Sequence, residues 1–151
     1  MAKTRIIDVT LSADTSAYAN ADLIADTQAA DAFTVNDGTG SIKSLVVVDG
    51  DDQTLYTFSL FFLDGSGSLG SENAAPSATD AVCQTVLARV DFATTDGLDL
   101  GGSKVYTKTG LNIPVRAITG TNDIGIAMVN ITGTPTHTAA GVRVRIGMEL
   151  D

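Results

Sequence analysis

Residues 41–64, SIKSLVVVDGDDQTLYTFSLFFLD, contain two strongly apolar runs joined by a short acidic segment. The runs at 45–48 and 60–63 are rich in valine, phenylalanine and leucine, and they are apolar at successive positions instead of alternating with polar residues. Runs of this kind are typical of strands that are covered on both faces. We therefore predict two central strands, 41–49 and 54–64, in a β-sandwich.

The segment between the two runs carries three carboxylates, Asp49, Asp51 and Asp52, together with Gly50. Closely spaced carboxylates can bind a hard cation such as Ca²⁺, which takes oxygen ligands from flexible loops. The spacing nevertheless lacks the further acidic ligands and the closing glutamate of an EF-hand loop. The sequence favours a solvent-exposed turn between two strands, and we predict no metal ligands here.

The rest of the chain has short apolar segments separated by glycine, asparagine and aspartate, the pattern of an all-β protein. The clearest alternation is in residues 142–150, where aliphatic residues and methionine face one way and arginine, glycine and glutamate face the other. Further strands are predicted at 22–26, 33–35, 87–93, 103–108, 111–118 and 124–131. Residues 1–11 also alternate, and they are either a first strand or an extended N-terminal arm.

One short helix is predicted near residues 79–87, where small polar residues precede apolar positions at helical spacing. Cys83, the only cysteine, falls in or beside the apolar stripe of this helix, so we expect a small buried hydrophobe and not a reactive thiol. Together these elements predict an all-β fold, a single-domain β-sandwich over residues 1–151, jelly-roll-like and with one short helix.

Composition restricts the partners that this chain can have. The formal net charge is −9, and a protein that binds a phosphate backbone needs a basic surface, so we expect no direct contact with nucleic acid. No apolar run reaches the length of a membrane span, and the N-terminal residues lack the apolar core of a secretory signal. We expect a soluble protein with no membrane partner.

No catalytic group of residues is recognisable. His137, the only histidine, lies in a loop with no cysteine or acid beside it, so we predict an exposed loop side chain. No nucleophile motif accompanies it, and the two glutamates, Glu72 and Glu149, are explained as solvated side chains. We predict that the protein is not an enzyme and has no catalytic residue and no cofactor.

Four segments together carry a resemblance to a known family: LSADTSAYANADLIADTQ (11–28), FFLDGSGSLGSENAAPSATDA (61–81), DLGGSKVYTKTGLNIPV (99–115) and GTPTHTAAGVRVRIGMEL (133–150). The chain resembles the small virion proteins that tailed bacteriophages encode beside the major capsid protein, the capsid decoration or cement proteins. The resemblance implies a jelly-roll-like subunit that trimerises on the outer surface of the capsid. Its partner would be the major capsid protein, and its role would be to stabilise the shell.

The N-terminal segment is the first candidate for a capsid contact, because its basic residues contrast with an otherwise acidic chain. The candidate contact residues are Lys3, Arg5 and Ile7. Loop 65–76 is the second candidate, on expected exposure alone.

The sequence leaves two other functions open. Jelly rolls also serve as carbohydrate-binding and host-attachment modules, but sugar sites usually need exposed aromatic platforms, and the chain has only three tyrosines and five phenylalanines. A hydrolase on a β-sandwich would need a catalytic pair that the sequence does not reveal.

Overall fold

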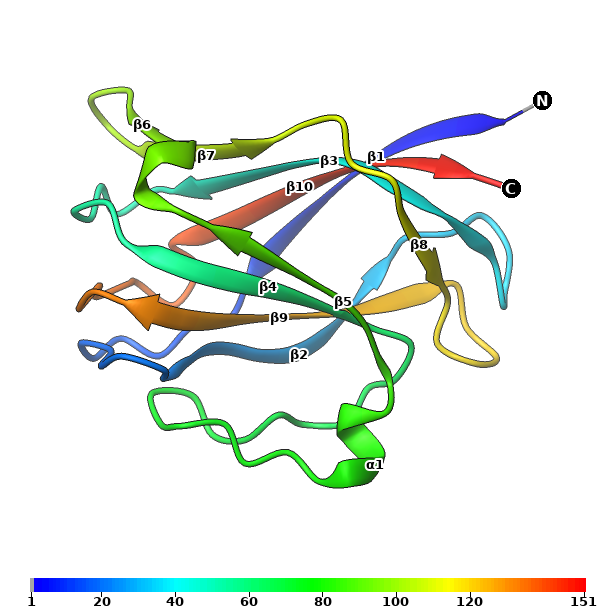
Figure 1. The fold of residues 1–151 in the computed structure, drawn as a ribbon, viewed down its shortest axis with the longest axis horizontal. Coiled ribbons are helices and arrows are strands. Elements are labelled where there is room, and N and C mark those ends of the chain that lie inside the picture. Colours follow the sequence, from blue (N-terminus) through cyan, green and yellow to red (C-terminus); the bar gives the residue numbers. More distant parts are fainter. Residues whose placement is uncertain (1) are drawn as a thin grey trace.

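The computed structural model describes residues 2–151 as two antiparallel β-sheets packed as a sandwich (Figure 1). The predicted all-β sandwich with one short helix is confirmed. The six-stranded sheet consists of β1 (Lys3–Leu11), β3 (Thr39–Asp49), β6 (Gly97–Asp99), β7 (Lys104–Lys108), β8 (Ile113–Arg116) and β10 (Val142–Leu150). The four-stranded sheet consists of β2 (Leu23–Asp31), β4 (Thr57–Leu63), β5 (Val86–Phe92) and β9 (Asp123–Thr132). The helix α1 (Asp80–Cys83) precedes β5, and a 3-10 turn, η1 (Thr94–Asp96), follows it.

The chain passes repeatedly from one sheet to the other. The strand order is β1-β10-β3-β7-β6 in one sheet, with β8 also paired to β3, and β2-β9-β4-β5 in the other. The first strand therefore lies beside the last, with Lys3 opposite Leu150 and Leu11 opposite Val142. Residues 1–11 were expected to be either a first strand or an extended arm, and residues 3–11 form the first strand, while residue 1 lies outside the described residues.

The two central strands are found as predicted, but in different sheets. β3 pairs with β10 on one side and with β7 and β8 on the other, while β4 lies between β9 and β5. The acidic link after β3 consequently crosses from the six-stranded to the four-stranded sheet and does not close a hairpin. Loop 133–141 makes the return crossing from β9 to β10.

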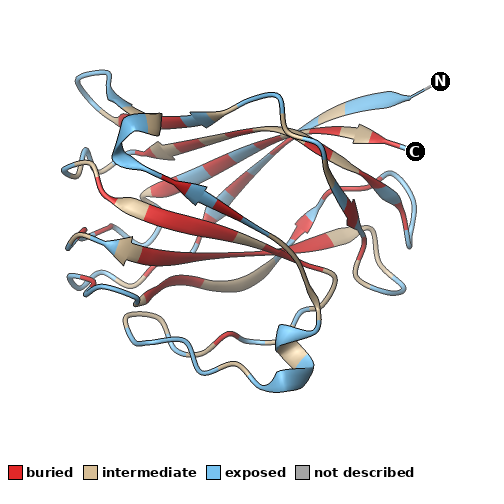
Figure 2. Cartoon of the chain, in the orientation of Figure 1, coloured by how far each residue is buried: buried red, intermediate tan, exposed pale blue. Residues whose placement is uncertain are grey.

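The core lies between the sheets and follows from the alternation of side chains along the strands (Figure 2). In β10 the residues at alternate positions from Val142 to Leu150 are buried, as the sequence predicts. The phenylalanine rings of Phe58 and Phe92 stack with centroids 4.8 Å apart, and Tyr106 packs edge-on against Phe58 at 4.9 Å. One continuous cluster joins the apolar side chains of both sheets.

Two predicted strands differ from the structure. The short strand expected at 22–26 continues to Asp31, because pairing with β9 stabilises a segment that is poor in apolar residues. The strand expected at 33–35 is wrong, since the backbone bends there. Asp37 in the following turn has a φ of 55°, the left-handed conformation that aspartate tolerates.

The helix is shorter than the predicted 79–87. Thr79 accepts a hydrogen bond from the Val82 backbone as the N-cap, and β5 already begins at Val86. A helix of a single turn can direct only one or two side chains toward the sheet. In α1 the Val82 side chain packs against it. Cys83 is exposed, so the prediction of a buried cysteine is wrong.

Segment 64–79 and α1 cover the outer face of the four-stranded sheet. Leu69 is buried there against residues from three strands, and its backbone N–H donates to the Asp26 carboxylate at 2.7 Å. Phe61 and Val82 pack against the same cluster. The second apolar side of β4 is therefore covered by its own chain, at the bottom of the view in Figure 1.

Candidate functional site

The outer face of the six-stranded sheet carries an apolar stripe. Directly opposite residues of antiparallel strands lie on the same side of a sheet. The pairing places Val48 between Arg143 on β10 and Val105 on β7, and Val105 lies opposite Leu98 on β6. We call this surface the open face, and define it by Ile6, Asp8, Thr10, Val46, Val48, Leu98, Val105, Arg143 and Arg145.

The open face combines apolar and basic groups in an acidic protein. Its two β3 valines are half-buried, whereas Leu98 is 64% exposed. A shallow groove of about 310 Å³ runs over Val46 and Val48 and is bordered by Arg143 and Arg145. Such a surface can bury apolar area against a partner and pair with its carboxylates.

The pair Arg145 and Asp8 lies at the β1 side of this face. The Arg145 Nε lies 2.8 Å from an Asp8 carboxylate oxygen, and this hydrogen bond lowers the pKa of Asp8. Both side chains are about half exposed, so the pair contributes little to stability but fixes the direction of the guanidinium.

The three candidate contact residues of the N-terminal segment are placed differently from one another. Lys3 is exposed, Arg5 is 3.2 Å from Asp31 and donates to the Phe33 carbonyl at 2.9 Å, and Ile7 is buried in the core. The neighbouring Ile6 is 69% exposed and lies on the open face. Capsid contact by this segment remains a prediction, and the structure adds Ile6 as the residue whose apolar side chain is available.

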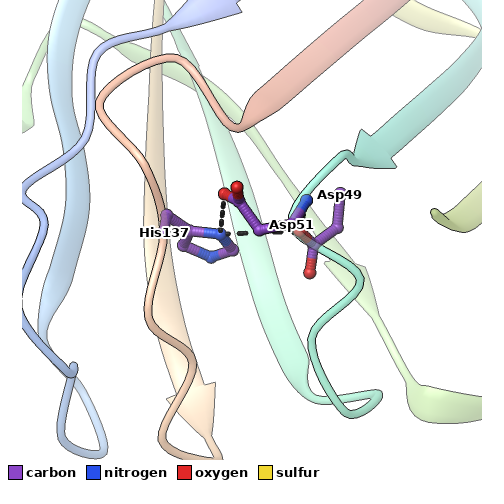
Figure 3. A group of neighbouring side chains, drawn as sticks. All are labelled: Asp49, Asp51 and His137. Atoms are coloured by element: carbon purple, nitrogen blue, oxygen red, sulfur yellow. Dashed lines mark hydrogen bonds and ion pairs between the residues drawn. The ribbon is translucent and has the colours of Figure 1, made fainter. Parts of the chain in front are cut away.

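A second feature is a buried polar cluster at the end of the sandwich where the two crossings meet. Asp49 is the last residue of β3 and continues the inward alternation of Leu45 and Val47. Asp51 follows in the link to β4, and His137 comes from loop 133–141 (Figure 3). The ligand atoms of these three side chains all lie within 4.8 Å of one another.

Burial is nearly complete in this cluster. The side chains of His137 and Asp49 are 0% and 1% exposed, and that of Asp51 is 16% exposed. The His137 Nδ1 lies 3.6 Å from Asp49 Oδ1 and 3.5 Å from Asp51 Oδ2. On the other side of the ring, Nε2 lies 3.0 Å from the Tyr56 hydroxyl.

The two carboxylates are held in place by hydrogen bonds from the two crossings. Asp49 Oδ1 accepts from the Asp51 backbone N–H at 3.0 Å, and Asp51 accepts from the backbone and the hydroxyl of Thr138, both at 2.9 Å. A Cβ atom on Gly141 would overlap the Asp51 carboxylate, so a larger residue at that position would displace this side chain. The surrounding hydrogen bonds and close contacts therefore hold the side chains of the cluster in fixed positions.

These positions correct two predictions. His137 is buried and not an exposed loop residue. Of the three carboxylates of the acidic link only that of Asp52 is exposed, to 41%. Asp52 instead pairs with Lys104 at 2.5 Å, and this lysine also lies 3.0 Å from Asp99. The alternation along β3 contained the signal that Asp49 faces inward, but no local pattern connects it with His137.

The cluster does not have the arrangement of a hydrolytic triad. Within residues 2–151, Tyr56 is the one side chain that is hydrogen-bonded to the His137 ring, and no serine or cysteine takes that place. Burial, with a contribution from the Asp49 carboxylate, raises the pKa of Tyr56 well above its usual value, so the phenol remains neutral. What the three side chains can do is bind a cation.

A scan against protein-family models and a search of curated proteins both find no match for this chain. Between residues 2 and 151 there is also no helix with the length and apolar character needed to cross a membrane.

Proposed function

We propose that this chain is a structural virion protein that binds the outer surface of a tailed-phage capsid and stabilises it as a decoration or cement protein. The observation that carries the proposal is the open face, where a groove lined by Val46 and Val48 and bordered by two arginines is left uncovered by the chain itself. A binding protein needs such a face, because apolar area and paired charges supply the affinity.

The strand order supports this proposal. Strands β1, β10, β3 and β7 are successive neighbours in one sheet and β2, β9, β4 and β5 in the other, and the chain crosses repeatedly between the sheets in the manner of a jelly roll. A jelly-roll subunit is what the resemblance to decoration proteins implies. The fold alone is shared by many functions, so it supports the proposal only together with that resemblance and the open face.

The mechanism would be non-enzymatic binding by a homotrimer. Each subunit contributes a modest contact area to the major capsid protein, and three linked contacts raise the effective affinity without new chemistry. The net charge of −9 keeps such a particle soluble and disfavours direct contact with the packaged nucleic acid. Ile6, exposed on β1, extends the proposed contact to the edge of the sheet, whereas Lys3 and Arg5 alternate with it and lie on the other face of that strand.

The alternative, a carbohydrate-binding or host-attachment module, is less well supported. Sugar sites commonly use exposed aromatic rings, but all three tyrosines and four of the five phenylalanines are buried. Only Phe61 is partly exposed. Phe61 packs under segment 64–79 and offers no platform. No observation on the described residues favours sugar binding over protein binding.

Binding to capsids tests the proposal directly. Purified protein titrated onto phage capsids that lack decoration is expected to bind saturably to the outer surface, and the decorated capsids are expected to withstand higher temperature. Pelleting gives the bound fraction, electron microscopy gives the position, and light scattering gives the oligomeric mass. Absence of saturable binding would refute the function, and a monomer at working concentrations would refute the trimer.

A further inference from the structure

We propose that Asp49, Asp51 and His137 bind a divalent transition metal ion, Zn²⁺ by the chemistry of the ligands, and that this ion joins the two crossings between the sheets. The site does not depend on the proposed function. Its elements are the link from β3 to β4, which supplies the carboxylates, and loop 133–141, which supplies the imidazole.

In the described part of the chain, two buried polar atoms of the cluster lack hydrogen-bond partners. Within residues 2–151 neither the His137 Nδ1 nor the Asp49 Oδ2 has a hydrogen-bond partner, although both atoms are fully buried. Buried polar atoms are normally paired, because they lose their bonds to water on folding. An unpaired imidazole nitrogen facing two carboxylates is the arrangement that a bound cation would satisfy (Figure 3).

The distances between the His137 Nδ1 and the two carboxylates fit a bound ion better than a hydrogen bond. A protonated imidazole would hydrogen-bond to a carboxylate at about 2.7–3.2 Å. The observed separations from Nδ1 are 3.5 and 3.6 Å, which are longer. Two ligands of a tetrahedral Zn²⁺, each about 2.0–2.2 Å from the ion, lie about 3.3–3.5 Å apart, which is close to what is observed.

Hydrogen bonds from neighbouring groups orient the imidazole and both carboxylates. When Nε2 carries the ring proton and donates it to the Tyr56 oxygen 3.0 Å away, Nδ1 presents its lone pair to the carboxylates. The hydrogen bonds from the Asp51 and Thr138 backbones fix the two carboxylates in the same way. Metal ligands are typically oriented by contacts of this kind.

The identity of the ion follows from the donor atoms. Ca²⁺ and Mg²⁺ prefer sites made of oxygen ligands alone, whereas an imidazole nitrogen with two carboxylates suits Zn²⁺. Three protein ligands leave one tetrahedral position for water. Because the ligands come from both crossings, the ion binds the folded chain and not the unfolded one, and it therefore stabilises the fold.

The experiment uses the full chain with Cys83→Ser, because the exposed Cys83 thiol could bind Zn²⁺ by itself. Protein treated with a chelator is titrated with Zn²⁺ by calorimetry, and its melting temperature is measured with and without the ion. We expect saturable binding of a single ion per chain and a higher melting temperature. His137→Asn and Asp51→Asn should abolish both effects.

Asp52→Asn is the matched control, since it removes a carboxylate from the same link without touching the cluster. This variant should bind Zn²⁺ like the parent. Tyr56→Phe, which removes only the partner of the ring nitrogen, should weaken binding about 10- to 100-fold. If His137→Asn does not fold, Asp51→Asn at the rim of the cluster and the absorption spectrum of the Co²⁺-loaded protein decide the question.

The proposal is overturned if the chelator-treated protein takes up no Zn²⁺ saturably. It is also overturned if Asp51→Asn binds the ion as tightly as the parent, or if Co²⁺ gives only the weak spectrum of a hydrated, six-coordinate ion.

Discussion

The outer faces of the two sheets differ in what covers them. On the four-stranded sheet, segment 64–79 and α1 bury the second side of β4, with Leu69 only 6% exposed. On the six-stranded sheet, the second side of β3 remains accessible, and Leu98 at the end of the stripe is 64% exposed. Two strands with the same kind of apolar sequence thus have different surroundings.

A strand that is apolar on both sides is therefore expected to be covered on both sides, but its sequence does not indicate which segment or protein covers it. For β4 the cover is a segment of the same chain, whereas for β3 we propose that it is another protein.

Leu69→Ala tests the covered side. Removing a buried leucine side chain should lower the free energy of unfolding by about 2–5 kcal/mol, because it leaves a cavity beneath segment 64–79. Urea denaturation measures the loss, and Ser66→Ala, at an exposed position in the same segment, is the control. A loss below about 1 kcal/mol, no more than the average point mutation, would mean that this segment does not cover the sheet in solution.

Alkaline pH tests the core that both faces share. Burial raises the pKa of Tyr18 to about 12, and it also raises the pKa of Tyr106. The unfolded chain loses these protons near pH 10, while the folded chain retains them, so the free energy of unfolding should fall as the pH rises above about 10.

Urea denaturation at increasing pH measures this decline, and phenolate absorbance reports the ionisation. Tyr18→Phe should make the decline shallower, because the variant has one fewer buried phenol. A free energy of unfolding that stays constant through pH 10 would contradict the burial of these tyrosines.

Val48→Lys tests the open face. A charge in the groove between two arginines should weaken capsid binding by about 10-fold, equivalent to about 1.4 kcal/mol, and leave the melting temperature nearly unchanged. Pelleting with capsids measures the affinity. Gln84→Lys adds the same charge at the exposed end of α1, over the covered sheet, and an equal loss in both variants would remove the distinction between the two faces.

Leu98→Ser should have the smallest effect on stability. The side chain is largely exposed, so the free energy of unfolding should change by no more than about 0.5 kcal/mol. Thermal denaturation measures this change in stability. A large loss of stability would show that the stripe is covered within the isolated chain.

The candidate site shows where prediction from sequence reached its limit. Alternation along β3 places Asp49 on the inward side, and this could be recognised from Leu45 and Val47. The partner of Asp49 could not, because His137 lies in a loop whose composition is typical of exposed segments. It is buried because β3 and β10 are neighbours, which brings the two crossings to the same end of the sandwich.

Local sequence was sufficient to predict the class of fold, the two central strands, the regular alternation of β10 and the position of the one helix. These features depend on local periodicity and on turn residues, which act over a few positions. The tertiary structure alone decided that the central strands belong to different sheets and that only one has an outer cover. It also decided that Asp49, Asp51 and His137 meet, because strand pairing and packing join residues that no local pattern connects.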